Sequence, residues 1–440
     1  MIARLRKLWS DINASYWFFP GLFAFATLLL AILTVELDRR GLTGWIDQLN
    51  WLPPARPEGA SNMLTVIAGS MIGVASTVFS ITIAAVAYAS GNYGPRLLTN
   101  FMEDRGNQLS LATFIGTFVY AITVLLSVRM PDEAGMLAAQ DGYKGFVPQL
   151  SLLVAYLFMA MSVTVLVYFL NHVPSSIRIN AVLEGIGRRL LNAIRDNFDE
   201  PMKARVEGEV REGTPVFASR TGYIQVINWH ELLKVARKSG SELQLAVRTG
   251  DFCHPSVAIG YWSEKPDDAC DEQVRECIAL GDARTPAQDL HFMIDELVEI
   301  GLRALSPGIN DPFTAISALH WIGAATAELG KRDLNWSVGE PDEDGRRPLR
   351  PMADDFSHYL GRGFGTIRSA AATSPPAATV MFDSLESAAV TITDPVRHKN
   401  IRDEADQLMR QAKASLTGPD LEQVEARFAL FRKRLEGHPK

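Results

Sequence analysis

The uncharged stretch 63–89 carries one group of residues that could contact a passing ion. Small and hydroxyl-bearing residues recur there at helical intervals and would share one face of a helix. Such a face either lets a second helix pack closely or lines a polar path, where hydroxyl oxygens replace part of an ion's hydration shell. The hydroxyls can also bond to carbonyls of their own helix. The candidate pore-lining residues are Gly69, Gly73, Ser76, Thr77 and Ser80.

A second group of polar residues flanks an apolar helical pattern in the stretch 281–315. Arg284 and Asp289 lie at its start, and Asn310 and Asp311 lie at its end. Charged and amide side chains of this kind can bind a ligand or a neighbouring subunit. We therefore take these four residues as candidates for a ligand site or an interface.

The same stretch also has the signals of two capped helices. Thr285 followed by Pro286 and Gln288 predicts a helix with Thr285 as its N-cap. Asp311 before Pro312 repeats the signal for the next helix. A well-capped structural hairpin explains these residues without any ligand, and both explanations stay open.

Other motifs with known chemistry are missing from the sequence. It has no P-loop, no GxGxxG and no GxSxG. Cys253 and His254 are adjacent, but no further metal ligands can be identified beside them. The sequence therefore predicts no catalytic residue, no metal and no cofactor, and we expect that the chain is not an enzyme. The histidines His230, His254, His291 and His320 show no His-x-x-x-His spacing, and the chain has no Cys-x-x-Cys pair.

Composition sets the broad class of the protein. The 440 residues carry a formal net charge of -7, which does not favour nucleic-acid binding. The chain has three cysteines, an odd number without metal-type spacing. This fits a reducing compartment better than a disulfide framework.

Four apolar stretches dominate the first third of the chain. None has a charged residue in its interior, and each is long enough to cross a bilayer as a helix. The sequence thus predicts a transmembrane domain over residues 1–173. The lack of ionisable groups at membrane depth argues against a proton-driven carrier, whereas a passive pore needs none. The predicted spans cover about 16–35, 63–89, 109–128 and 150–170.

Basic residues indicate the orientation of these spans. Four spans place both ends on the same side, and the positive-inside rule puts the side with more Lys and Arg in the cytoplasm. We therefore expect a multi-pass protein with both termini cytoplasmic. The residues that favour this side are Arg4, Arg6, Lys7, Arg178, Arg188, Arg189 and Arg195.

The remainder of the chain is predicted to be cytoplasmic and mixed. Residues 174–212 have the periodicity of an amphipathic stalk helix. Residues 213–265 contain short β-branched and aromatic runs with one helix inserted at about 229–238, which predicts a small β-rich module, a compact barrel. Residues 266–440 are mainly helical. The predicted fold class is thus a four-helix transmembrane bundle, a small β-rich module and a mainly α-helical cytoplasmic domain.

Two stretches carry a resemblance to a known family. They are SGNYGPRLLTNFMEDRGNQLSLATFIGTFVYA (90–121) and GDARTPAQDLHFMIDELVEIGLRALSPGINDPFTA (281–315), and ALSPGINDPFTA is the most specific part. Together they resemble the bacterial predicted membrane proteins of domain of unknown function 2254. The resemblance covers nearly the whole chain and implies a bacterial inner-membrane protein with a soluble C-terminal region. It transfers no catalytic role to any residue.

Two functions remain open from the sequence. In one, several copies assemble into a passive channel or pore for ions or small solutes, with the cytoplasmic domain as its gate. In the other, the chain is a membrane-anchored scaffold or sensor whose cytoplasmic domain binds a ligand or a protein partner. The expected partners are the lipid bilayer and further copies of the chain, and no nucleic acid.

Overall fold

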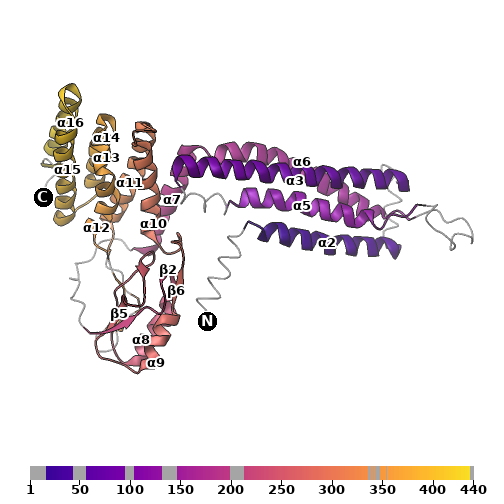
Figure 1. The fold of residues 1–440 in the computed structure, drawn as a ribbon, viewed down its shortest axis with the longest axis horizontal. Coiled ribbons are helices and arrows are strands. Elements are labelled where there is room, and N and C mark those ends of the chain that lie inside the picture. Colours follow the sequence, from indigo (N-terminus) through magenta and orange to yellow (C-terminus); the bar gives the residue numbers. More distant parts are fainter. Residues whose placement is uncertain are drawn as a thin grey trace, which may run out of the picture. The chain divides into compact units, whose positions relative to one another are not determined.

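The computed structural model describes residues 16–42, 56–94, 104–130, 146–198, 213–334, 338–339, 341, 347–352 and 354–436. The chain divides into two compact units at Arg178 (Figure 1). We call the unit that ends at Arg178 the membrane unit and the unit that begins at Ile179 the C-terminal unit. The predicted fold class is confirmed: apolar helices come first, then a small strand module, then further helices.

Four helices of the membrane unit are long and apolar enough to cross a bilayer. The second of them begins at Pro57, six residues before the predicted span, because proline fits the first turn of a helix. Its 37 residues make a rod of about 56 Å, well beyond the ~30 Å of a hydrocarbon core. The four helices are α2 (Phe18–Arg39), α3 (Pro57–Tyr93), α5 (Arg105–Leu125) and α6 (Gln149–Ser176).

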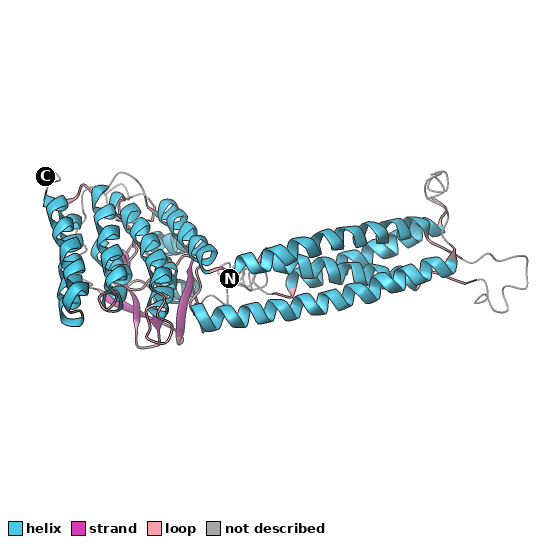
Figure 2. Ribbon diagram, turned by 90° about the horizontal axis from the view of Figure 1, so that it is seen from above, coloured by secondary structure: helices cyan, strands magenta, loops and turns pink. Residues whose placement is uncertain are grey.

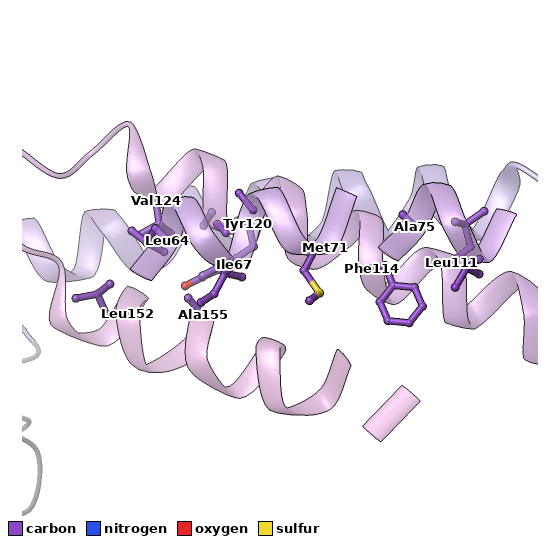
Figure 3. Packing of buried hydrophobic residues seen from close by; sticks show 14 of the residues in the cluster. Leu64, Ile67, Met71, Ala75, Leu111, Phe114, Tyr120, Val124, Leu152 and Ala155 are labelled. Carbon is purple, nitrogen blue, oxygen red and sulfur yellow. The ribbon is translucent and has the colours of Figure 1, made fainter. Parts of the chain in front are cut away.

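Helix α5 is the centre of the membrane unit. It contacts α2, α3 and α6, and 61% of its most apolar stretch is buried, against 33% or less in the other three. Figure 3 shows Phe114 and Tyr120 of α5 among side chains of the neighbouring helices. The Tyr120 hydroxyl lies 2.9 Å from that of Thr34 on α2 and donates to the Ser151 carbonyl of α6 at 3.2 Å. Tyr120 thus joins three helices.

Charged groups of the membrane unit stand at the helix ends. The Asp38 carboxylate accepts the backbone N–H groups of Leu150 and Ser151, each at 3.0 Å, and so caps α6 from a different helix. Asp104 caps α5 by accepting the Gly106 N–H, and its other oxygen lies 2.8 Å from Nε2 of His172. These carboxylates satisfy helix N-termini, where negative charge is favourable.

The C-terminal unit begins with an amphipathic helix and a strand module. The strands form two sheets, with orders β1-β5-β3-β7 and β4-β2-β6, in place of the expected compact barrel. They also reach beyond residue 265, since β6 pairs with β2 and β7 pairs in parallel with β3. The elements are α7 (Ile179–Asn197), β1 (Thr214–Phe217), β2 (Gly222–Ile227), α8 (Trp229–Ser239), β3 (Leu243–Leu245), β4 (Phe252–Cys253), β5 (Ala258–Trp262), α9 (Asp268–Glu276), β6 (Ile278–Gly281) and β7 (Leu349–Arg350).

A layered array of helices completes this unit. Helix α11 packs on α7, α10 and α14, and α14 packs on α16. Figure 2 shows the strands in magenta along one side of these helices. The remaining helices are α10 (Leu290–Ala304), α11 (Pro312–Lys331), α12 (Phe356–Leu360), α13 (Thr366–Ala371), α14 (Pro375–Val390), α15 (Pro395–Ser415) and α16 (Gly418–Glu436).

A π-helical turn, η3 (Gly361–Gly365), joins α12 to α13 without a break. It is rich in glycine, and a Cβ at Gly363 would meet the Ile322 side chain of α11 at 2.9 Å. Close packing on α11 therefore favours glycine here. π-turns inside helices are frequent at functional sites, and this one carries Arg362 beside the cluster described next.

Candidate functional site: a polar cavity in the C-terminal unit

The five candidate pore-lining residues of α3 all lie on its exposed surface. A Cβ at Gly69 or Gly73 would meet no atom within 4 Å. Thr77 donates its hydroxyl hydrogen to the Gly73 carbonyl, and Ser80 donates to the Ser76 carbonyl. This small-residue stripe therefore packs on no other described helix of its own chain, and it faces lipid or another molecule.

Of the four polar candidates, the structure brings Arg284 and Asp289 together. Asn310 and Asp311 lie away from this pair. Arg284 Nη2 lies 2.8 Å from Oδ2 of Asp289, just before α10. Asn310 and Asp311 follow the other end of the helix, and the 15 residues of α10 span about 22 Å. Asp311 accepts the Thr314 N–H at 3.1 Å, so it is the N-cap of α11, as the sequence predicts.

The predicted start of α10 at Thr285 is wrong. Asp289 is the N-cap and accepts the Phe292 N–H at 3.0 Å. The chain turns before it because Gln288 has a positive φ of 62°. The side-chain oxygen of Gln288 accepts the Ile227 N–H of β2, and the backbone carbonyl of Gln288 accepts the Thr249 hydroxyl at 2.6 Å. Contacts with distant segments thus override the local capping signal.

This late start places Asp289 and Asp295 in one chain of ion pairs. Arg284 reaches both carboxylates, at 2.8 Å and 2.5 Å. Arg362 of η3 makes two parallel bonds to Asp295, at 2.8 and 2.7 Å, a geometry with strong directional preference. The chain of charges thus fixes η3 against α10.

A cavity of about 170 Å³ opens beside this network. That volume is below the 300–1,000 Å³ of drug-sized ligand sites, so it suits an ion with a few waters or a very small molecule. Residues of α7, α10, α12 and the segment 247–249 form its wall. Its polar members include Asn197, Arg248, Thr249, His291 and Asp354, and Tyr359 adds an aromatic face.

A second hollow of about 500 Å³ lies beside η3 and α15. It is the larger of the two, but its main charged side chains neutralise each other. The Arg368 guanidinium donates to both Glu404 oxygens at 2.8 Å. We therefore place the candidate site in the smaller cavity, whose polar groups are less completely paired.

Three potential metal ligands lie close together beside the smaller cavity, and two of them, His291 and Asp354, line it. Their ligand atoms, from His291, Asp354 and His358, all lie within 4.8 Å of one another. Nε2 of His291 is 3.1 Å from Oδ2 of Asp354, and Nε2 of His358 is 3.6 Å from Oδ1. The His291 ring stacks on the Tyr359 ring with an interplanar angle of 10°, which fixes its plane.

Both imidazoles are held in the neutral state. Burial lowers the pKa of His291 to about 2, with smaller contributions from the positive charges of Arg362 and Arg248. Burial and then Arg248 also lower the pKa of His358. Burial raises the pKa of Asp289, although Arg284 opposes the shift. His291 can therefore offer a lone pair at neutral pH, whereas Nε2 of His358 lies 3.5 Å from Nη1 of Arg248.

Sequence reasoning found Arg284 and Asp289 but missed His291, Asp354 and His358 as a group. The one local signal was Asp354-x-x-x-His358, because residues four apart share a helix face. His291 is 63 residues upstream and its partners depend on the tertiary fold. The sequence-based expectation of no metal site therefore has a specific alternative in this structure.

Comparison with known proteins gives the family but no activity. The family model described as "Predicted membrane protein (DUF2254)" matches residues 13–387. The chain is 27% identical over 367 residues to the uncharacterized proteins Mb1321c of Mycobacterium bovis and Rv1290c of Mycobacterium tuberculosis. Each match covers 81% of this chain and 68% of the relative. No solved structure matches. With most of its length matched, the chain belongs to this family of predicted membrane proteins.

Proposed function

We propose that this protein is a membrane-anchored sensor, in which the cavity of the C-terminal unit binds a small polar ligand or ion. The observation that carries the proposal is the convergence of Arg248, His291 and Asp354 on a small cavity whose charges come from separate elements. Buried polar groups are costly unless they are satisfied. Such an arrangement is favourable when a ligand completes it.

The covalent link between the units offers a route for the signal. Helix α6 ends at Ser176 and α7 begins at Ile179, and Asn197 at the end of α7 lines the cavity. A ligand that binds one state of the cavity better than another shifts the population of that state. In this proposal α7 carries the shift, and the protein acts by binding rather than by catalysis.

The orientation is part of the proposal. We place the protein in the bacterial inner membrane with both termini and the cavity in the cytoplasm, on the basis of the positive-inside rule. Single cysteines introduced at Gly59 and Ala138, the latter outside the described residues, should react with an impermeant thiol reagent in intact cells. A cysteine at Ser415 should react only after lysis. The opposite pattern would reverse the orientation.

The exposed stripe of α3 favours a second function, an oligomeric pore. Several copies arranged around an axis would cover this stripe and bring its hydroxyls to the pore wall. Purified protein in liposomes should then conduct ions or small solutes. Gly73→Leu and Ser80→Leu should stop the flux and leave a folded oligomer, whereas Ile72→Leu, which lies beside the stripe and keeps the side-chain volume, should not stop it. Folded protein without any flux would contradict the pore, and the sensor would be the remaining proposal.

Cysteine cross-linking tests the sensor. Gly73→Cys in a Cys270→Ser background reports contacts between copies in membranes, because Cys253 and Cys277 are buried. Asn197 is exposed at the cavity rim, so Asn197→Trp should block the cavity without disturbing the core. We expect this change to alter the cross-linking yield, while Asn197→Ala leaves it unchanged. Equal yields for both variants would contradict the coupling of cavity and membrane unit.

A further inference from the structure

We propose that His291, Asp354 and His358 bind a divalent transition-metal cation. The inference rests on the proposed function, since it names the ligand class of the same cavity. Two imidazole nitrogens and one carboxylate are a common protein ligand set for zinc and for iron, with the remaining coordination positions taken by water or a small ligand. Oxygen-rich sites for magnesium or calcium have a different composition.

The spacing of the ligand atoms fits one shared ion. Donors about 2.0–2.2 Å from a tetrahedral centre lie roughly 3.3 Å from one another. Nε2 of His291 is 3.1 Å from Oδ2 of Asp354, and Nε2 of His358 is 3.6 Å from the other oxygen, Oδ1. All three ligand atoms fall within 4.8 Å, so only the widest separation has to shorten. Asp354 lies just before the N-cap Asp355 and His358 lies in the first turn of α12, so side-chain rotations on this short segment can bring the two ligands closer.

The burial of His291 is the second observation. Its side chain is 8% exposed, and Nε2 makes no hydrogen bond among the described residues although Asp354 Oδ2 is only 3.1 Å away. A buried polar atom without a hydrogen bond needs an explanation. In the tautomer with its proton on Nδ1, His291 directs the Nε2 lone pair into the same space as Oδ2 of Asp354, which is what a shared cation requires.

Several positive charges surround this site. Arg248 binds the Oδ1 oxygen of Asp354, and Arg284 and Arg362 lie close enough to affect His291. Their positive charges are offset by Asp289 and Asp295, which pair with Arg284 and Arg362. Arg248 leaves the Oδ2 oxygen of Asp354, the one nearest His291, for the metal. Its Nη1 also lies 3.5 Å from Nε2 of His358, so metal binding requires Arg248 to move away from that nitrogen. A guanidinium on the other oxygen orients the carboxylate, as groups behind metal ligands commonly do.

Metal binding to the full-length protein tests the proposal. The protein would be purified in detergent without a metal-affinity step, treated with a chelator and titrated with Zn²⁺ by calorimetry, with Co²⁺ absorption as a second readout. We expect one metal per chain. His358→Gln should weaken Zn²⁺ binding by more than about 100-fold, because a direct ligand matters at least as much as its supporting groups. His320→Gln, an exposed histidine on α11, should bind as wild type does.

A second variant protects the test against misfolding. Asp354→Asn keeps the shape of the side chain and an oxygen for Arg248, and it should also lose Zn²⁺ while near-UV circular dichroism stays native. Undiminished binding in folded His358→Gln and Asp354→Asn, or no binding by wild type, would overturn the metal site. Failure of the sensor is seen separately: metal would bind normally, but Asn197→Trp would not change cross-linking at Gly73→Cys.

Discussion

The two units of this protein satisfy their polar side chains in different ways. In the membrane unit, hydroxyls such as those of Thr77 and Ser80 bond to carbonyls one turn back on the same helix. Within the spans, bonds between helices are made by neutral groups, as between Thr117 and Ser162 at 2.9 Å, and the carboxylates of Asp38 and Asp104 act at helix ends. In the C-terminal unit several buried or half-buried polar groups are charged, and they join elements far apart in sequence, as Asp295 and Arg362 do.

The predicted environments of the two units, lipid for the spans and water for the C-terminal unit, account for this difference. A lipid core cannot hydrate a charge, so charged groups are excluded from the middle of the spans and hydroxyls are satisfied locally. A water-exposed unit can bring charges together, but each buried charge then depends on its partner. Removal of one group should therefore be costly in the C-terminal network and cheap in the membrane unit.

The largest effect is expected for Asp295→Ala. Asp295 binds both Arg284 and Arg362. The substitution removes this carboxylate partner from two guanidinium groups that are largely buried. Breaking such a pair costs about 3 kcal/mol or more. The thermal midpoint of full-length protein in detergent, followed by near-UV circular dichroism, measures the loss.

Glu299→Ala on the same helix is the matched control. Glu299 pairs with Arg303 at 3.5 Å across one turn, and both side chains are partly exposed. A solvent-screened pair of this kind is worth about 0.3–0.5 kcal/mol. Similar losses for the two variants would mean that the Asp295 network is no more than a set of surface ion pairs.

An intermediate effect is expected at the helix caps. Asp311→Ala should destabilise the C-terminal unit by about 1 kcal/mol, because its carboxylate accepts the Thr314 N–H. Thr285→Val should change the midpoint little or raise it, since the buried Thr285 hydroxyl makes no hydrogen bond among the described residues. A loss of stability at Thr285 equal to that at Asp311 would restore Thr285 as a cap.

The caps also show how far the sequence could predict this structure. The four spans were predictable because about 20 successive apolar residues are a local property imposed by the bilayer. Asp311 was predictable because its cap bond lies within four residues. The start of α10 was not, because Gln288 is held by Ile227 and Thr249. Such contacts have no signal near residue 288.

The candidate metal site shows the same limit more strongly. Strand β7 joins its sheet by pairing with β3, about 100 residues earlier, and Asp354 follows shortly after β7. The position of Asp354 beside His291 thus depends on long-range pairing. The Asp354-x-x-x-His358 spacing was visible in the sequence, but it is frequent on ordinary helix surfaces. The spacing indicates a metal site only because the fold places the buried His291 beside both residues.

The smallest effect is expected for the bond between Thr117 and Ser162. A double-mutant cycle of Thr117→Val and Ser162→Ala, measured by detergent-induced unfolding, should give a coupling of about 0.6 kcal/mol, the average for hydrogen bonds between membrane helices. The value is small because Thr117 keeps a local acceptor, the Thr113 carbonyl at 2.8 Å, when Ser162 is removed.

Thr123→Val paired with Ser162→Ala is the control, since Thr123 bonds to the Val119 carbonyl of its own helix, and it should show no coupling. A Thr117–Ser162 coupling as large as the loss at Asp295 would break the comparison, because hydroxyls in the membrane unit would then depend on distant partners as strongly as the charges of the C-terminal unit do.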